Sequence, residues 1–265
     1  VSDQFKALII NQEGDNFTRE VKSIDKSFLK HGDVTIKVDY SDLNFKDGMI
    51  LKNGGRLVKE FPHIPGIDFS GTVIESENSK FKEGDEVILT GFRVGEVFFG
   101  GYSQIAKVNA DFLVKKPKDL TSKQAMILGT AGFTSLMSAF AIQARESILL
   151  GEKVNDVLVT GATGGVGSVA VIALTKLGYN VTAVTGKDSK ADYLKSLGAK
   201  TVVNRAEFDK DPKLIDKGLW DGVVDTVGGK ILANAIVQTN SNGIIAVCGM
   251  QIQMNLIRMY YPLCL

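Results

Sequence analysis

The sequence has few of the residues that hold transition metals or form disulfides. Its 265 residues include only two cysteines, Cys248 and Cys264, and two histidines, His31 and His63. Two cysteines cannot build a disulfide framework, and Cys248, in an apolar segment, is expected to be a buried thiol. His31 precedes a predicted strand and is expected in solvent. His63 is expected to pack within its loop or to line a cleft.

Neither an excess of charge nor a long apolar run is present. The 31 basic and 30 acidic residues leave a net charge of +1, which argues against a nucleic-acid partner. The sequence has no run of about 18 apolar residues and no signal-peptide core, so we expect a cytoplasmic protein without a membrane partner. A hydrophobic fraction of 44% is enough for one large or two ordinary folded domains.

The most informative segment is residues 156–167, which read Asp-Val-Leu-Val-Thr-Gly-Ala-Thr-Gly-Gly-Val-Gly. It predicts a strand over 157–160, a tight glycine turn, and a helix over about 166–177. Glycines let the backbone approach a pyrophosphate, and the helix N-terminus attracts the anion, so the unit predicts dinucleotide binding. A glycine turn that binds nothing is the alternative. A triphosphate-binding loop is excluded because Gly167-Ser168 lacks the required lysine.

Further strands alternate with helices after this turn. Strands are predicted over 179–185, 201–203, 220–227 and 243–247, and a helix ends over 194–198. Nearly continuous apolar strands are typical of a parallel sheet with helices on both faces. The predicted fold class is therefore α/β, with a doubly wound parallel sheet.

The end of the second strand of this sheet indicates which cofactor fits. An acidic side chain there would bind the 2′-hydroxyl of NAD, but the segment reads Thr185-Gly186-Lys187. A small hydroxyl and a cation suit a 2′-phosphate, and Arg205 can add a second cation, so NADPH is favoured. Two alternatives stay open: Asp188 serves NAD if the strand ends later, or Lys187 is only a solvated charge.

The first 120 residues have a different pattern. Short segments that alternate apolar and polar residues predict an all-β domain, barrel-like or sandwich-like. Its strands are expected over 6–10, 33–39, 68–74, 85–90 and 101–108.

We expect domains over residues 1–120 and 121–265, joined by the polar segment 115–124. Thr121 or Ser122 should cap the next helix, and another helix is expected over about 133–144. Ligand sites favour domain interfaces, so the β domain should supply substrate contacts.

Several motifs along the chain resemble those of a known family. They are Ser41-Asp-Leu-Asn-Phe-Lys-Asp47, Phe61-Pro-His-Ile-Pro-Gly-Ile-Asp-Phe-Ser-Gly71, Gly129-Thr-Ala-Gly-Phe-Thr134, the turn at 159–167, and Tyr193-Leu-Lys-Ser-Leu-Gly-Ala199. Their order resembles the medium-chain dehydrogenase/reductase superfamily, in its zinc-independent quinone oxidoreductase branch and closest to the acrylyl-CoA reductase group. The resemblance implies an N-terminal GroES-like β domain, a Rossmann domain, a small-molecule substrate and a homodimer.

The resemblance also implies where the chemistry occurs. Asn44 would lie by the nicotinamide, and Lys46 would stabilise developing negative charge unless it pairs with Asp47 or Asp42. Phe45 stands where many members have tyrosine, so it has no proton to give and would instead pack on the cofactor ring. Solvent is then the alternative proton source.

Metal and cofactor contacts follow from the same resemblance. Zinc-dependent members place their ligands where this chain has residues 44–47 and Ile67-Asp68, so no catalytic metal is expected and Asp68 should be structural or hydrogen-bonded. Thr130 would contact the nicotinamide, although its hydroxyl could cap a helix instead. The other expected cofactor contacts are Thr163, Gly164, Gly165, Val166, Thr185, Gly186, Lys187, Arg205 and Met250.

After Met250 the sequence motifs no longer resemble the family. This predicts a Rossmann domain that is incomplete at its C-terminus, through a frameshift, a premature stop, an artefact or a true short variant. The expected function is an NADPH-dependent reductase that transfers a hydride to an activated C=C bond or a quinone. The alternative is an NADPH-binding protein with little or no catalysis because of the shortened C-terminus.

Overall fold

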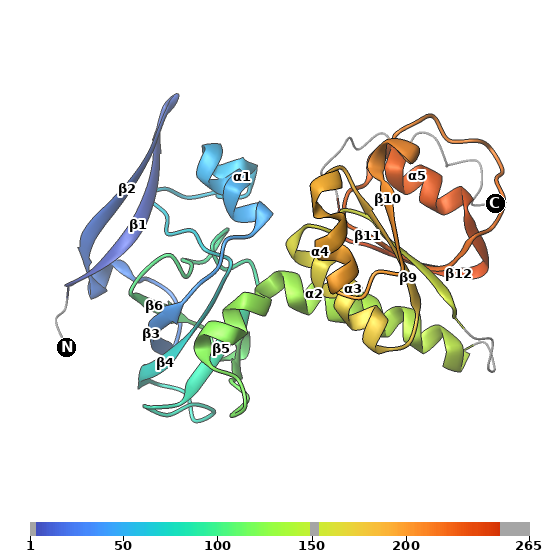
Figure 1. Cartoon of the computed structure of the whole chain (residues 1–265). Coiled ribbons are helices and arrows are strands. Elements are labelled where there is room, and N and C mark those ends of the chain that lie inside the picture. Colours follow the sequence, from blue (N-terminus) through green and yellow to red (C-terminus); the bar gives the residue numbers. More distant parts are fainter. Residues whose placement is uncertain (1–3, 149–153, 250–265) are drawn as a thin grey trace. The chain divides into compact units, whose positions relative to one another are not determined.

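The structure is a computed structural model that describes residues 4–148 and 154–249 (Figure 1). The chain divides into two compact units, residues 1–130 and 131–265. The sequence motifs placed the boundary after residue 120, within the polar segment that leads into the long helix α2 (Ser122–Ile148).

The first unit is built from antiparallel strands. β1 (Gln4–Glu13) pairs with β2 (Asn16–Asp25), and five more strands form a sheet in the order β6-β3-β4-β5-β7. Alternate side chains of this sheet, such as Phe69, Val73 and Leu89, are buried in its core. The five strands are β3 (Val34–Tyr40), β4 (Asp68–Ser76), β5 (Glu86–Thr90), β6 (Ile105–Val108) and β7 (Leu113–Lys115).

Short helices connect these strands. α1 (Phe45–Asn53) follows β3, and the sequence pattern did not predict it. The carboxylate of Asp47 accepts a hydrogen bond from Asn44 N at 2.9 Å, which stabilises the first turn of α1. Among the described residues of both units, the 3₁₀ turns are η1 (Lys26–Phe28), η2 (Gly54–Arg56), η3 (Ala110–Phe112), η4 (Asp188–Lys190) and η5 (Arg205–Glu207).

Helix α2 begins with the predicted cap. Gln124 N donates to Thr121 Oγ1 at 3.1 Å, and Thr121 N donates to Gln124 Oε1 at 2.9 Å. Residues Ser122–Arg145 are long and apolar enough to cross a membrane by length and composition alone. The non-helical Gly129 (φ 51°, ψ −155°) interrupts that stretch, and Ile142 is fully buried. Both features are typical of a helix that packs in a protein core.

The second unit contains a parallel sheet of five strands in the order β10-β9-β8-β11-β12. The strands are β8 (Asp156–Val159), β9 (Asn180–Thr185), β10 (Thr201–Asn204), β11 (Trp220–Asp225) and β12 (Thr239–Val247). The accompanying helices are α3 (Gly165–Lys176), α4 (Ala191–Ser196) and α5 (Gly229–Val237). The order corresponds to a Rossmann half, in which the first strand lies centrally and leads into the phosphate-binding turn.

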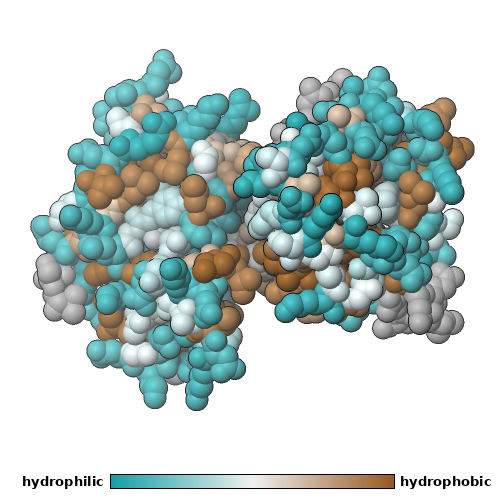
Figure 2. Space-filling model, in the orientation of Figure 1, coloured by the Kyte–Doolittle hydropathy of each residue, from teal (hydrophilic) through white to brown (hydrophobic). Residues whose placement is uncertain are grey.

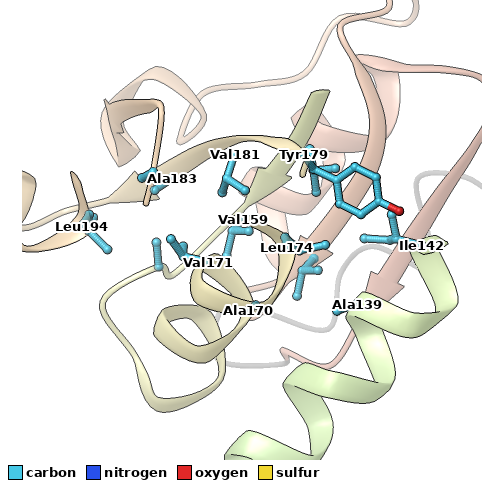
Figure 3. Close-up of a cluster of buried hydrophobic side chains, with 14 of the residues drawn as sticks. Ala139, Ile142, Val159, Ala170, Val171, Leu174, Tyr179, Val181, Ala183 and Leu194 are labelled. Atoms are coloured by element: carbon cyan, nitrogen blue, oxygen red, sulfur yellow. The ribbon is translucent and has the colours of Figure 1, made fainter. Parts of the chain in front are cut away.

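Both faces of this sheet are covered. Val157 and Val159 of β8 pack with Leu174 of α3 on one face (Figure 3). Leu158, between them, packs with Ile231 of α5 on the other. Successive side chains of β8 are therefore buried under helices on opposite faces of the sheet, which confirms the predicted doubly wound sheet.

The prediction for Cys248 is wrong. The thiol is exposed, although it donates to Asp225 O at 3.3 Å. The residue follows the end of β12, which is the last strand in the sheet order, so fewer neighbours cover it than cover a central strand.

Candidate active and cofactor-binding site

The glycine turn lies between β8 and α3. Gly164 is the residue that caps α3, and both Gly164 and Gly165 are exposed. A Cβ atom on Gly164 would meet only Gly161 O, at 3.2 Å, whereas one on Gly167 would lie 2.4 Å from that oxygen. Gly167 is thus required by packing, while Gly164 leaves open space at the N-terminus of a helix. This cradle fits the pyrophosphate of a dinucleotide.

A buried hydrogen-bond network fixes the strand ends beside this turn. Asp225 is fully buried and accepts hydrogen bonds from Thr160 Oγ1 at 2.6 Å and from Gly228 N at 2.8 Å. Burial raises the pKa of the Asp225 carboxyl above its ordinary value. The Thr160 hydroxyl in turn accepts from Thr226 N at 3.0 Å. The carboxyl ends of β8 and β11 are therefore tied together, a link that the sequence motifs did not reveal.

The end of β9 presents the residues expected at the 2′-phosphate. Lys187 N donates to Thr185 Oγ1 at 3.1 Å, and Thr163 Oγ1 lies 3.4 Å from the same hydroxyl. A Cβ atom on Gly186 would lie 3.3 Å from Arg205 Cζ, so the Arg205 guanidinium stands directly beside the strand end. The fold thus brings together two exposed cations that are 18 positions apart in the sequence.

The other expected cofactor contacts are placed as follows. Val166 O accepts a hydrogen bond from Ser135 Oγ at 2.6 Å, which joins the first turn of α3 to α2. Asp188, the acidic alternative for NAD, accepts from Asn204 Nδ2 at 2.6 Å. Met250 lies outside the described residues.

In the first unit, Asn44 joins two carboxylates. Its Nδ2 group donates to Asp42 Oδ1 at 2.5 Å and to Asp68 Oδ2 at 3.1 Å. Asp68 is fully buried, and its Oδ2 also accepts from Thr130 N at 2.8 Å and Thr130 Oγ1 at 2.7 Å. The expected hydrogen-bonded role of Asp68 is therefore confirmed. The Thr130 hydroxyl binds this carboxylate.

One member of this group, Asp42, retains its proton at neutral pH. Burial, followed by the neighbouring Asp68 carboxylate, raises the pKa of Asp42 to about 8. Burial is also the main cause that raises the pKa of Asp47, which accepts from Ile67 N at 3.1 Å. Tyr102 Oη donates to Asp42 O at 2.9 Å, and burial raises the pKa of this phenol. Sequence motifs missed Asp42 because it lies in the loop after β3, whereas its neighbour Asp68 begins β4, 26 positions later.

Lys46 does not pair with either aspartate that the sequence offered. Its Nζ lies 2.8 Å from Glu96 Oε1, in an ion pair formed across 50 positions of the chain. Phe45 is 62% exposed, so its ring is available for packing against a ligand. His63 is buried, lies 5.5 Å from the Phe99 ring, and pairs with Ile10 through its backbone. The loop-packing prediction for His63 is thus confirmed.

The donor set of this region does not fit a zinc site. Within residues 4–148 and 154–249, no three His, Cys, Asp or Glu side chains are arranged to hold a metal ion. Asp68 Oδ2 is occupied by the hydrogen bonds from Thr130 and Asn44, and residues 44–47 contain no cysteine or histidine.

The Asp42→Asn variant should lose less stability than the parent protein as pH rises from about 4 to about 8. Folding raises the pKa of Asp42 from 3.8 to about 8, so the native state keeps a proton that the unfolded chain loses over this window. The contribution of Asp42 to stability should therefore fall as pH rises from about 4 to about 8, by less than the one-proton limit of ~1.4 kcal/mol per pH unit. The amide introduced by this substitution keeps an acceptor for Asn44 and cannot ionise, so the slope should flatten.

Urea unfolding at several pH values measures this effect. Asp47 should leave a residual slope of the same sign in Asp42→Asn, since the pKa of Asp47 is also raised. Asp39→Asn, at an exposed carboxylate of the same unit, is the control. An Asp42→Asn slope equal to that of the parent protein would contradict the raised pKa of Asp42.

Comparison with known proteins agrees with this fold. The chain matches the alcohol dehydrogenase GroES-like domain over residues 30–118 and the zinc-binding dehydrogenase domain over residues 165–263. It is 46% identical to an acrylyl-CoA reductase of Ruegeria pomeroyi over 249 residues, which cover 93% of this chain and 74% of that protein. The chain belongs to the medium-chain dehydrogenase/reductase family. The protein is accordingly an oxidoreductase, as the sequence motifs predicted.

A second relative belongs to the quinone oxidoreductases. A putative quinone oxidoreductase of Bacillus subtilis is 45% identical over 251 residues, 94% of this chain and 75% of that protein. Its crystal structure with NAD bound has a TM-score of 0.91 at 43% identity, covering 100% of this chain and 80% of that one. An oxidoreductase of Salmonella enterica in complex with NADP has a TM-score of 0.88 at 42% identity, covering 97% and 79%.

These matches also bear on the C-terminal residues. The zinc-binding dehydrogenase match runs to residue 263, so the family resemblance continues past Met250, where the sequence motifs had ended. The chain spans about three quarters of the length of these two relatives.

Proposed function

We propose that this chain is an NADPH-dependent reductase that adds a hydride to an activated C=C bond or to a quinone. The observation that carries the proposal is the open cradle at Gly164, followed at the next strand end by Lys187 and Arg205. NADP is bound in the Salmonella relative, and the two curated relatives are named for acrylyl-CoA and quinone chemistry. When bound, the nicotinamide would supply the hydride.

The chain's own residues would hold the reactants and the charge. The turn at 161–167 would bind the pyrophosphate, and Lys187 and Arg205 the 2′-phosphate. Asn44 is held by the carboxyl groups of Asp42 and Asp68 and would lie by the nicotinamide, and Lys46 would stabilise the negative charge that develops on the substrate. Protonated Asp42 adds a donor that Phe45 cannot supply. A cytoplasmic location and a homodimer are part of this proposal.

A steady-state assay tests the function. NADPH oxidation should be observed with at least one of acrylyl-CoA, a small uncharged enone and a quinone. NADPH binding without turnover on any of the three would favour the alternative of a binding protein with little catalysis. No turnover together with no NADPH binding would contradict both.

We expect the activity to be independent of a bound metal. The segment at 44–47 lacks cysteine and histidine, and within residues 4–148 and 154–249 no three His, Cys, Asp or Glu side chains are arranged as a zinc ligand set. Elemental analysis of the purified protein should find zinc far below one atom per chain, and a chelator should leave the rate unchanged. Stoichiometric zinc with chelator-sensitive turnover would overturn this prediction.

A further inference from the structure

An open pocket of about 580 Å³ lies along α1 in the first unit. It is lined by Leu43, Asn44, Phe45, Gly48, Met49 and Lys52. Leu43 and Phe45 are 74% and 62% exposed, and Figure 2 shows hydrophobic side chains at the surface in this region. The volume is in the range of small-molecule sites, and apolar side chains gathered around a hollow are typical of a binding surface.

Gly48 lies in the middle of α1, where glycine is unfavourable compared with alanine. Its backbone is not in the left-handed region, and a Cβ atom there would meet nothing within 4 Å. Neither the backbone nor the packing therefore requires glycine at this position. The lack of a side chain at Gly48 instead leaves room in the pocket.

Positive charge gathers at the far end of the same helix. Lys52 is exposed, and among the described residues no acidic side chain forms an ion pair with it. Arg19 donates to Leu51 O and, at 2.7 Å, to Lys52 O, which places a second cation at the C-terminus of α1. The rise of a helix puts Lys52 about 12 Å beyond Asn44. The pocket thus runs from Asn44 past apolar walls to a cationic end.

We propose that this pocket binds the phosphate-bearing arm of an acyl thioester, with Gly48 leaving space for the arm and Lys52 attracting its phosphate. The inference rests on the proposed function, because it assigns a binding place to the arm of the substrate whose C=C bond is reduced. A three-carbon acyl group is too short to reach both ends of the pocket. A quinone ring carries no negative charge for Lys52. An arm of the coenzyme A type has the required length and ends in phosphate.

Calorimetric titration of the full chain with propionyl-CoA, in the presence of NADP, tests the proposal without needing turnover. Lys52→Gln should raise the Kd about tenfold, as expected for a lost charge-assisted contact. Gly48→Leu should raise it at least as much, and Gly48→Ala by less, because the loss follows the volume placed in the pocket. Lys37→Gln, at an exposed lysine of β3, is the matched control and should change the Kd less than about twofold.

A second ligand separates phosphate recognition from general binding. S-propionyl-N-acetylcysteamine has the thioester but no phosphate, so Lys52→Gln should leave its Kd unchanged. Equal losses for both ligands, or no loss for propionyl-CoA in a variant with an unchanged melting curve, would overturn the proposal. NADPH oxidation by the parent protein with a small uncharged enone reports the proposed function separately. Enone turnover without propionyl-CoA binding would therefore reject this inference alone.

Discussion

NADPH binding should weaken about a hundredfold or more when Gly164 is replaced by valine, while the protein remains folded. The backbone at Gly164 is extended (φ −80°, ψ 172°), a conformation that valine adopts readily, and a Cβ atom would meet only Gly161 O at 3.2 Å. The branched side chain would then occupy the space where a pyrophosphate approaches the N-terminus of α3. Loss of two charge-assisted hydrogen bonds at ~1.5–3 kcal/mol each gives this magnitude.

Other glycines of the turn serve as controls for folding. Gly167→Ala should lower the melting temperature, because its Cβ atom would lie 2.4 Å from Gly161 O and 2.7 Å from Ala162 Cα. Gly165→Val should also block the cofactor, but a Cβ atom there lies 3.2 Å from Ala131 Cβ, so some loss of stability is expected as well. Replacing the cap glycine should cost only about 1 kcal/mol of stability.

Fluorescence titration with NADPH and thermal unfolding, measured on the same purified variants, decide the question. A folded Gly164→Val protein with the affinity of the parent would show that the pyrophosphate does not approach the backbone at Gly164. That result would remove the main support for the proposed function.

The Rossmann strands could be predicted from the sequence within a few residues. β8, β9 and β10 are short runs of β-branched residues, and burial on both faces demands such runs in a parallel sheet. α1 was missed because Gly48 interrupts it and exposed Leu43, Phe45 and Met49 obscure an amphipathic pattern. β2, which pairs with β1, was missed because most of its side chains are exposed, so its sequence shows little alternation of apolar and polar residues.

The candidate site was predictable mainly where its residues are close in sequence. The turn at 161–167 and the strand end at 185–187 are local motifs with a local physical reason. The ion pair of Lys46 with Glu96 and the contact of Asp42 with Asp68 join separate segments, so neither has a signature in one stretch of sequence.

Removing both strand-end cations should change the cofactor preference of the protein. In the Lys187→Ala/Arg205→Ala variant we expect NADPH affinity to fall about a hundredfold or more, since each lost contact to a 2′-phosphate is worth ~1.5–3 kcal/mol. The affinity for NADH, which lacks that phosphate, should change less than about threefold. Arg205 contributes because its guanidinium lies beside Gly186, where a Cβ atom would be 3.3 Å from Arg205 Cζ.

Two further variants separate this explanation from its alternatives. Lys190→Ala removes an exposed cation in η4, three positions after Lys187, and should leave both affinities unchanged if position, not net charge, matters. Asp188→Asn tests the acidic alternative, and it should leave NADH affinity unchanged because the carboxylate is held by Asn204 at 2.6 Å. Equal losses of NADPH and NADH in the double variant would mean that Lys187 and Arg205 support the strand end rather than recognise phosphate. A selective loss of NADH binding in Asp188→Asn would instead identify Asp188 as the residue that reads the ribose.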